Sequence, residues 1–267
     1  MLYIVATPIG NLSEITYRAV EVLKSVDFIA AEDTRHTMEL LKAYDIRKPM
    51  LSYHKFSERA SSEGIIALLK EGKNIALVSD AGMPLISDPG ATLVEALIQN
   101  GIEYTVVSGA CACINALVLS GLDTRSFLMV GFLPEKNVDR NREMARVADV
   151  EATLVFYSPP HNVLNDLEFL FKHLGRRKVS VVREISKLHE QVIHGYLGEL
   201  PGFTVKGEMV IVVEGAKSPG ERLKGLSVID HVKHYMSLGW SKADAVKRTA
   251  SDRKVAKSVI YAQTLDL

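Results

Sequence analysis

Short apolar runs alternate with amphipathic stretches through the first half of the chain. Residues 2–6, 28–31 and 75–78 form apolar runs that stop at polar or turn residues, as buried strands do. Between the runs, apolar side chains recur at helical spacing, for example across 58–70 before Gly72. Further short strands are predicted at 51–55, 104–107 and 127–130. The alternation predicts an α/β domain.

A stretch of glycine, proline and charged residues at 131–137 interrupts this alternation. We therefore predict a first domain over residues 1–131 and a second domain over 132–215. In the second domain, helices are predicted at 138–148 and up to residue 173, and strands at 153–157, 179–182, 190–195 and 208–213. Because only its first elements alternate between helix and strand, we expect a mixed sheet there.

The tail, residues 216–267, begins with a glycine-rich linker and then reads as helical at 227–238, 241–250 and 252–264. Ser241 and Asp244 resemble a capping box. Nine Lys or Arg and four Asp fall between residue 222 and the end, whereas the whole chain has 32 basic and 32 acidic residues. The pattern is compatible with a basic helix-turn-helix that contacts nucleic acid. A solvated helical cap on the second domain would explain it equally well.

One loop that follows a strand is longer than a turn requires. Residues 79–90 contain two Asp, two Gly and two Pro, whereas most β–α connections take about two to six residues. Asp88 is expected to cap a helix that begins at Pro89. In open α/β sheets, ligands bind at the carboxyl ends of the strands. The loop is therefore a candidate ligand site.

Three more loops follow predicted strands in the first domain. Residues 7–12 and 108–112 are rich in small side chains, and the helix after the first of these is expected to begin at Ser13 as its cap. Residues 32–36 are all polar; they could carry chemistry, or Asp33 or Thr34 could cap a helix, and both can hold. A G-x-G-x-x-G fingerprint and a P-loop lysine are both absent from the sequence. Together the loops predict a shared cleft.

Composition narrows the class of protein and the kinds of site to be expected. The 267 residues are 24% charged and 47% hydrophobic with no net charge, which is typical of a soluble globular protein. Apolar runs are too short to cross a membrane, and we expect a cytoplasmic protein without a leader. Cys111 and Cys113 would point in different directions on a helix, so we expect neither a disulfide nor a metal site. The histidines show no metal-ligand spacing either.

Five motifs together resemble a known family. They are 2–12 (Leu-Tyr-Ile-Val-x-Thr-Pro-Ile-Gly-Asn-Leu), 30–37 (Ala-Ala-Glu-Asp-Thr-Arg-His-Thr), 52–54 (Ser-Tyr-His), 79–90 (Ser-Asp-Ala-Gly-x-Pro-Leu-Ile-Ser-Asp-Pro-Gly) and 131–134 (Gly-Phe-Leu-Pro), with Lys-Gly-Glu at 206–208 continuing the match. In this order they are similar to the bacterial ribosomal RNA ribose methyltransferases of the tetrapyrrole methylase superfamily. The resemblance covers roughly residues 2–215, and the tail resembles the small basic C-terminal domain of that family.

The resemblance implies two α/β domains of the tetrapyrrole methylase (class III methyltransferase) type with a cleft between them, plus a small all-helical C-terminal domain. It implies a homodimer that uses S-adenosylmethionine (SAM) to methylate a cytidine 2′-hydroxyl in 16S ribosomal RNA of the 30S subunit. The residues that would bind SAM by position are Pro8, Gly10, Asp80, Ala81, Gly82, Met83, Ile86, Cys111, Ala112, Tyr157 and Gly207.

Two segments depart from the family pattern. Residues 108–112 read Ser-Gly-Ala-Cys-Ala instead of Pro-Gly-Pro-Ser-Ala, so Cys111 replaces a hydroxyl and the loop loses both prolines. Residues 158–162 read Ser-Pro-Pro-His-Asn instead of Glu-Ser-Pro-His-Arg, which removes an acid and a base. If that pair grips RNA, substrate or affinity would differ from the family's.

Methyl transfer to a ribose hydroxyl benefits from a nearby base. Loop position and residue type make Glu32 and Asp33 the first candidates for this base, and Asp80 is a further candidate. The residues expected to contact RNA are Arg35, His54, Lys247, Arg248, Arg253 and Lys254. Two other hypotheses remain: a SAM-dependent methylase of a small, tetrapyrrole-like molecule, and a non-catalytic RNA-binding protein of ribosome assembly.

Overall fold

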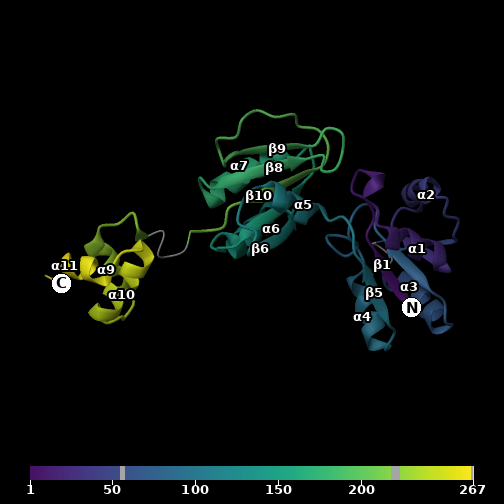
Figure 1. The fold of residues 1–267 in the computed structure, drawn as a ribbon, viewed down its shortest axis with the longest axis horizontal. Helices are drawn as coiled ribbons and strands as arrows, with labels where there is room; N and C mark the ends of the chain where they lie inside the picture. Colours follow the sequence, from purple (N-terminus) through teal and green to yellow (C-terminus); the bar gives the residue numbers. More distant parts are fainter. Residues whose placement is uncertain (55–57, 218–222, 266) are drawn as a thin grey trace.

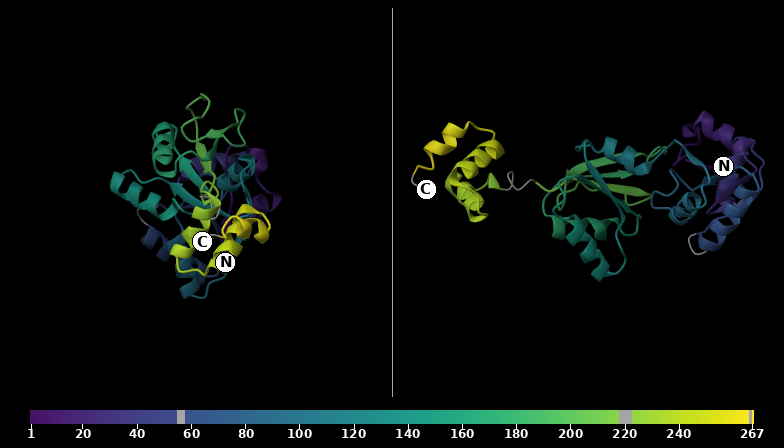
Figure 2. Two further views of the ribbon diagram at one scale, coloured as in Figure 1. Left: turned by 90° about the vertical axis from the view of Figure 1, so that its left-hand side faces the viewer. Right: turned by 90° about the horizontal axis from the view of Figure 1, so that it is seen from below.

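The computed structural model describes residues 1–54, 58–217, 223–265 and 267. Three bodies follow one another along the long axis: two α/β domains and a helical tail (Figures 1 and 2). The tail lies beyond the second domain, away from the first (Figure 1). No helix within the described ranges is long and apolar enough to span a bilayer.

The first domain is a parallel sheet of five strands in the order β3-β2-β4-β1-β5. Its strands are β1 (Leu2–Val5), β2 (Phe28–Ala31), β3 (Met50–Ser52), β4 (Ile75–Val78) and β5 (Tyr104–Val107). Its helices are η1 (Leu12–Glu14), α1 (Tyr17–Ser25), α2 (Thr34–Ala43), α3 (Glu58–Lys70) and α4 (Ala91–Gln99). The predicted strands and the helix at 58–70 are confirmed, except that the strand predicted at 51–55 already ends at Ser52 and its residue 55 lies outside the described ones.

The period-2 alternation of β4 explains how both faces of this sheet are covered. Ile75 and Leu77 pack with residues of α3 and α4, whereas Ala76 and Val78 pack with residues of α1 and α2. The helix after β1 therefore lies on one face and the helix after β4 on the other, although β1 and β4 are neighbours. Adjacent strands whose connections leave in opposite directions open a crevice at their carboxyl ends. That crevice positions the site.

The second domain contains a mixed sheet, as predicted, and its five strands lie in the order β6-β7-β10-β8-β9. The strands are β6 (Phe127–Phe132), β7 (Thr153–Ser158), β8 (Lys178–Arg183), β9 (Gln191–Tyr196) and β10 (Met209–Val213). Helices α6 (Asn137–Val147) and α7 (Val163–Leu174) contribute to one apolar cluster with this sheet. Helix α5 (Ala112–Leu119) contributes to the cluster on the opposite face. Each face of this sheet is thus packed by apolar helical side chains.

The chain crosses between the two sheets at 108–111. Helix α5 contacts β7 and β10 of the second sheet, and β6 pairs with β7. The predicted boundary after residue 131 falls inside β6. Because α5 is apolar and follows a strand of the first domain, its sequence suggests one more helix of that domain. Only its packing on β7 and β10 assigns it to the second sheet.

The tail folds around its own small core. Its helices are α9 (Val228–Ser237), α10 (Lys242–Arg253) and α11 (Lys257–Ala262), and Val232, Tyr235, Val246 and Ile260 are among the buried residues between them. Ser227 and Ser241 cap the first two helices. The predicted last helix over 252–264 is present as α11, but its predicted start is wrong, because α10 continues to Arg253 and ends at Lys254 in the left-handed region. Asp252 is held there by Tyr235, His231 and Arg248.

Two predicted helix caps are also wrong. Ser13 lies inside the short 3-10 turn η1, and the α-helix begins after Thr16, whose hydroxyl accepts the N–H of Ala19 at 3.1 Å. Helix α4 begins after Gly90, at a backbone φ of 138°. Asp88 is therefore not used as a cap.

Candidate active site between the two α/β domains

A cavity of about 360 Å³ lies between the two α/β domains. This volume falls within the range of small-molecule sites. The first domain contributes Ile9, Asp80, Ala81, Ile86, Ser87 and Asp88, and the second contributes Ala112, Phe132, Tyr157, Ser158, Pro159, Pro160, Ile185, Glu208, Met209 and Val210. The predicted cleft is therefore present at the carboxyl ends of β1 and β4.

Backbone hydrogen bonds lock the loops after β1 and β4 to each other. Thr7 and Gly82 exchange two N–H···O=C bonds of 2.9 and 3.1 Å. The Thr7 hydroxyl donates to the carbonyl of Ser79 at 3.3 Å, and the Ser79 hydroxyl donates to the carbonyl of Gly82 at 3.3 Å. The first wall of the cavity is thus a fixed backbone.

Three carboxylates gather on this first wall. Asp80 accepts the backbone N–H of Asp33 at 3.0 Å, which ties the loop after β2 to the loop after β4. Burial raises the pKa of Asp88 to about 6, with the charges of Glu32 and Asp80 adding to the effect and the Ser79 hydroxyl opposing it. Glu32 and Asp88 also share a small crevice behind the cavity. Asp88 is therefore a carboxyl that changes charge close to neutral pH.

Asp33, by contrast, is engaged locally. Its carboxylate accepts the backbone N–H of Arg35 at 2.8 Å as the cap of α2 and pairs with the guanidinium of Arg35 at 3.2 Å. These contacts with Arg35 hold the pKa of Asp33 below its ordinary value. The capping hypothesis for this segment is confirmed, and the lowered basicity makes Asp33 a weak acceptor for a proton.

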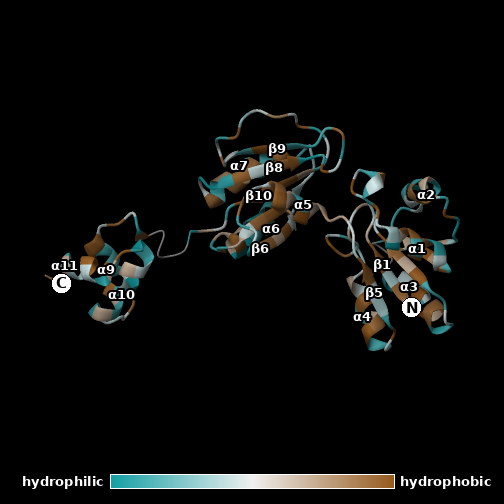
Figure 3. Ribbon diagram, viewed as in Figure 1, coloured by the Kyte–Doolittle hydropathy of each residue, from teal (hydrophilic) through white to brown (hydrophobic). Residues whose placement is uncertain are grey.

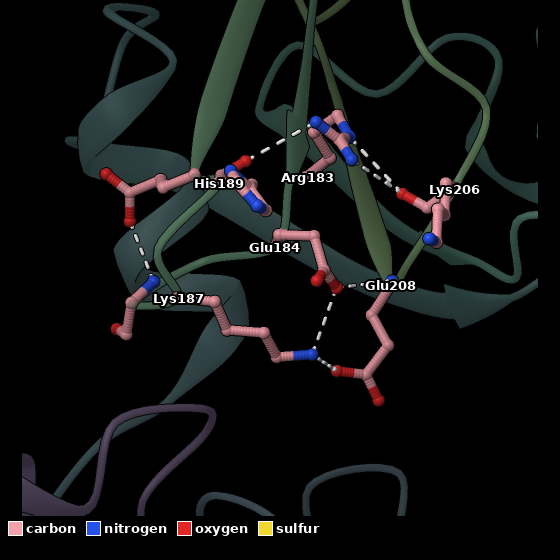
Figure 4. Close-up of polar contacts among 8 residues, drawn as sticks. Arg183, Glu184, Lys187, His189, Lys206 and Glu208 are labelled. Carbon is pink, nitrogen blue, oxygen red and sulfur yellow. Dashed lines mark hydrogen bonds and ion pairs between the residues drawn. The ribbon is translucent and has the colours of Figure 1, made fainter.

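The second wall carries acids that are neutralised by a lysine. Lys187 Nζ donates to Glu184 Oε1 and to Glu208 Oε2, each at 3.0 Å (Figure 4). The N–H of Glu208 in turn donates to Glu184 at 3.2 Å. A Cβ on Gly207, whose φ is 81°, would collide with the carboxylate of Glu184. Glycine at 207 therefore allows this ion-pair cluster to close.

A buried arginine fixes the loops behind that cluster. Arg183 is 8% exposed and donates to the carbonyl of Lys206 at 3.2 and 3.1 Å and to that of His189 at 3.4 Å (Figure 4). It thereby connects the segment that follows β8 to the one that precedes β10. Glu208, which lines the cavity, is positioned through this connection.

A second buried ion pair supports the end of β7. Asp166 accepts the Ser158 hydroxyl at 2.6 Å and pairs with Arg140 at 2.9 Å. The Arg140 guanidinium lies 4.3 Å from the centre of the Phe169 ring. Ser158, in the segment that departs from the family pattern, is thus held in the cavity wall by α6 and α7.

The cavity suits a cationic ligand with a flat, apolar part. Its described lining includes the carboxylates Asp80, Asp88 and Glu208 but no Lys or Arg. The rings of Phe132 and Tyr157 lie with their centroids 5.3 Å apart and their planes tilted by 53°, beside apolar side chains of both domains.

The predicted cofactor residues are distributed unevenly. Asp80, Ala81, Ile86, Ala112 and Tyr157 line the cavity. Pro8 and Gly10 line a separate hollow of about 280 Å³ in the first domain, which also contacts Asp80. The remaining four are not lining residues: Gly82, Cys111 and Gly207 each adjoin one in sequence, and Met83 adjoins none. Gly10 also packs against Lys187, so a loop of the first domain reaches the second wall here.

Two acidic lining residues, Asp88 and Glu208, were missed by sequence reasoning. Asp88 was assigned to a cap, because an Asp before Pro-Gly is typical of a helix start. Glu208 was passed over as the last residue of the Lys-Gly-Glu motif. The signal for both was available, since each lies within a motif of the resemblance.

The predicted RNA-contacting residues do not share one location. Arg35 is 90% exposed on the first domain, and His54 is exposed on the same domain. Lys247, Arg248 and Lys254 are exposed on the tail. Arg253 faces inward: it donates to His231 Nδ1 at 3.1 Å and to the carbonyl of Leu226.

The cysteines differ from expectation in their geometry. Both are free thiols, but Cys111 precedes α5 with an extended backbone, and its sulfur lies 3.5 Å from that of Cys113. The prediction that they point apart is wrong, because only Cys113 is inside the helix. Among the described residues, no group of three or more His, Cys, Asp or Glu could hold a metal ion.

The family profile described as Tetrapyrrole (Corrin/Porphyrin) Methylases matches residues 1–201. The chain belongs to the tetrapyrrole methylase family. Three relatives are each named Ribosomal RNA small subunit methyltransferase I. The one from Halalkalibacterium halodurans is 43% identical over 97% of this chain and 93% of its own, and the one from Bacillus subtilis is 40% identical over 98% and 92%. The third, from Thermotoga maritima, is 42% identical over 80% of this chain and 98% of its own.

Solved structures of other tetrapyrrole methylases share the fold. Uroporphyrin-III-C-methyltransferase from Thermus thermophilus superposes with a TM-score of 0.59 at 22% identity, over 80% of this chain and 93% of that one. The methyltransferase CobJ gives a TM-score of 0.59 at 18% identity, over 80% and 94%. The predicted fold class is confirmed.

Proposed function

We propose that the protein is a SAM-dependent methyltransferase that methylates the ribose 2′-hydroxyl of a cytidine in 16S ribosomal RNA of the small subunit. One observation carries the proposal: relatives that are 40–43% identical over nearly the whole chain bear the name Ribosomal RNA small subunit methyltransferase I. The acidic, partly aromatic cavity supports a methyltransferase on chemical grounds.

SAM would be held between the two walls. Asp80 and Asp88 on the first wall provide negative charge for its cationic groups, and Phe132 and Tyr157 provide aromatic surface for the adenine. When bound, SAM supplies a methyl carbon that its sulfonium makes electrophilic. The protein's own contribution is to orient the ribose oxygen and to exclude water, which together can be worth roughly 7–11 kcal/mol.

The base that accepts the proton of the 2′-hydroxyl is proposed to come from the first wall. Glu32, Asp33 and Asp80 are the candidates from the sequence, and Asp88 joins them because it lines the cavity beside Asp80. Burial raises the pKa of Asp88 to about 6, which suits a general base near neutral pH. We therefore rank Asp88 first, and Asp33 last because Arg35 occupies its carboxylate.

RNA would be contacted by basic groups on two bodies. Arg35 and His54 belong to the first domain, and Lys247, Arg248 and Lys254 belong to the tail. Arg253 is proposed to support the tail rather than to contact RNA. The relative from Thermotoga maritima aligns over nearly its full length with only 80% of this chain, which supports an auxiliary role for a segment as long as the tail.

The tail's role can be tested with Lys247→Ala/Lys254→Ala. Because phosphate contacts release counterions, the double variant should bind RNA more weakly and reduce the slope of log K against log salt by about 1.4 to 1.8. SAM affinity should be unchanged. An unchanged salt slope would leave the tail as a structural cap.

The homodimer is supported by uncovered apolar surface. Strand β5 is at the edge of the first sheet, and its Tyr104 and Val106 are exposed because the helix that follows covers the other domain. Ile114 and Val118 of that helix, α5, are exposed as well, and Figure 3 colours α5 mostly as hydrophobic. A second copy would bury such surface. We place the protein in the cytoplasm, where its proposed ribosomal substrate is assembled.

The proposal is tested by transfer of labelled methyl from SAM to unmethylated 30S subunits, with naked 16S RNA as the comparison. We expect label on one cytidine 2′-oxygen. SAM binding without label on either RNA would favour a small-molecule methylase, and the absence of SAM binding would favour a non-catalytic assembly protein.

A further inference from the structure

Two thiols meet at the edge of the cavity, and neither is assigned a step in the proposed methyl transfer. Cys111 is the residue before α5, and Cys113 lies in the first turn of that helix. Their sulfur atoms are 3.5 Å apart. Ala112, between them, lines the cavity. We propose that Cys111 and Cys113 are a peroxide-reactive dithiol that closes to a disulfide and thereby alters the cofactor wall.

Cys111 has the surroundings of an attacking thiol. It occupies the cap position of α5, where a side-chain acceptor normally meets free backbone N–H groups. The Cys113 thiol lowers the pKa of Cys111 most strongly, and the N–H groups of Ile114 and Cys113 lower it further, whereas burial opposes the shift. Since the thiolate is the nucleophile, Cys111 is the sulfur that reacts first.

Cys113 has the complementary role. It is 4% exposed, and burial and its contact with Cys111 raise its pKa. It therefore stays protonated and shielded until a reactive sulfur forms beside it. This is the arrangement of a reactive cysteine next to a resolving one.

The chemistry balances with a peroxide as the oxidant. The Cys111 thiolate attacks one peroxide oxygen, the O–O bond breaks, and the leaving hydroxide takes up a proton to become water. Cys113 then loses its proton and attacks the Cys111 sulfenic acid, so the S–S bond forms and the S–O bond breaks with release of a second water. Two thiols lose two electrons in total, and one hydrogen peroxide becomes two waters.

Closing the disulfide must move the cavity wall. A disulfide requires about 2.05 Å between the sulfur atoms, so the two sulfur atoms have to come closer than their present 3.5 Å. Gly109 packs against Ala6 of the first domain, where a Cβ would already be too close at 2.8 Å. Tyr157 lies beside Cys113 and lines the cavity. We therefore expect Ala112 and Tyr157 to shift when the disulfide forms. Because both line the cavity, this shift would weaken SAM binding.

The first experiment treats the reduced full-length protein with hydrogen peroxide and follows free thiols, intact mass and the peptide that contains both cysteines. We expect loss of both thiols, a mass lower by two hydrogen atoms, an internal bond in that one peptide, and recovery with dithiothreitol. Cys113→Ser should instead stop at an oxygen-bearing Cys111. Cys111→Ser should slow oxidation at pH 7 by about tenfold or more, since an ordinary thiol is only a few per cent thiolate there.

Calorimetry then compares SAM binding before and after oxidation. The sulfur chemistry stands independently, whereas this second part rests on the proposed function. We expect affinity to fall by about tenfold, a loss of about 1.4 kcal/mol, and to return on reduction. Separate sulfinic acids or disulfides between chains would overturn the dithiol, and unchanged affinity would overturn its effect on the wall. A reduced protein that binds no SAM would contradict the proposed function and leave the thiol result intact.

Discussion

The two walls of the cavity carry their charges in opposite ways. On the first wall, Asp80 and Asp88 line the cavity without a cation among the described lining residues. On the second wall, Glu184 and Glu208 share Lys187, and Asp166 is paired with Arg140. The carboxylates of the first wall are therefore available to a cationic ligand, whereas those of the second wall are paired with cations of the protein itself.

This difference separates function from stability. An unpaired, half-buried carboxylate costs folding free energy and is retained for what it binds or for a proton that it accepts. A buried ion pair, once formed, must stay complete because loss of one partner leaves the other uncompensated. First-wall substitutions should therefore affect activity, and substitutions of buried pairs in the second domain should affect folding.

The largest effect is expected for Asp88→Asn. Losing the proposed base should lower turnover by about 10²- to 10⁴-fold, while the thermal midpoint stays equal or rises because a buried charge is removed. Single-turnover methyl transfer measures the turnover, and calorimetric unfolding measures the thermal midpoint. Asp139→Asn on the surface of α6 is the control. Lowered stability with normal turnover would reverse the assignment of the two walls.

Asp166→Ala should act on stability instead. Its side chain is 5% exposed and that of Arg140 is 13% exposed, so the substitution leaves a buried guanidinium unpaired. We expect a loss of about 3–5 kcal/mol in the free energy of unfolding. The matched control, Asp139→Ala, breaks the exposed pair with Arg142 and should cost about 1 kcal/mol or less. Equal losses in denaturant titrations would show that burial does not decide the outcome.

The pH dependence gives a smaller effect with a defined sign. If Asp88 with a pKa of about 6 must be ionised, the rate should fall about tenfold for each pH unit below that value. Because the folded-state pKa is raised from 3.8, the folded protein binds the proton more tightly, and stability should decrease as pH rises from about 4 to about 6. Asp88→Asn should remove both dependences. A rate profile that persists in this variant would assign the base elsewhere.

The smallest effect is expected for Lys187→Met. The lysine side chain is 30% exposed and Glu208 is 77% exposed, so solvent screens much of the attraction. We expect a loss of about 1 kcal/mol or less in unfolding free energy. Turnover should stay within a few-fold of the parent, and a collapse of turnover would show that the second wall takes part in the chemistry.

Much of the fold was determined by the sequence alone. The short apolar runs set β1, β2, β4, β5 and β10, because a buried strand needs little more than apolar residues between turn signals. The helix over 58–70 and the Ser227 and Ser241 caps are likewise local. The ordered motifs also placed the cavity, since loops after neighbouring parallel strands must meet at one edge.

Tertiary structure decided what local patterns leave open. Helix α5 is apolar enough to suit either sheet, and only its packing on β7 and β10 assigns it to the second domain. Asp88 looks like a helix cap until the backbone at Gly90 shows that the helix begins later. Cys111 and Cys113 approach because one of them lies outside the helix. The local sequence is compatible with more than one outcome in each case. The packing of α5, the backbone conformation at Gly90 and the approach of the two sulfur atoms are fixed only when the whole chain has folded.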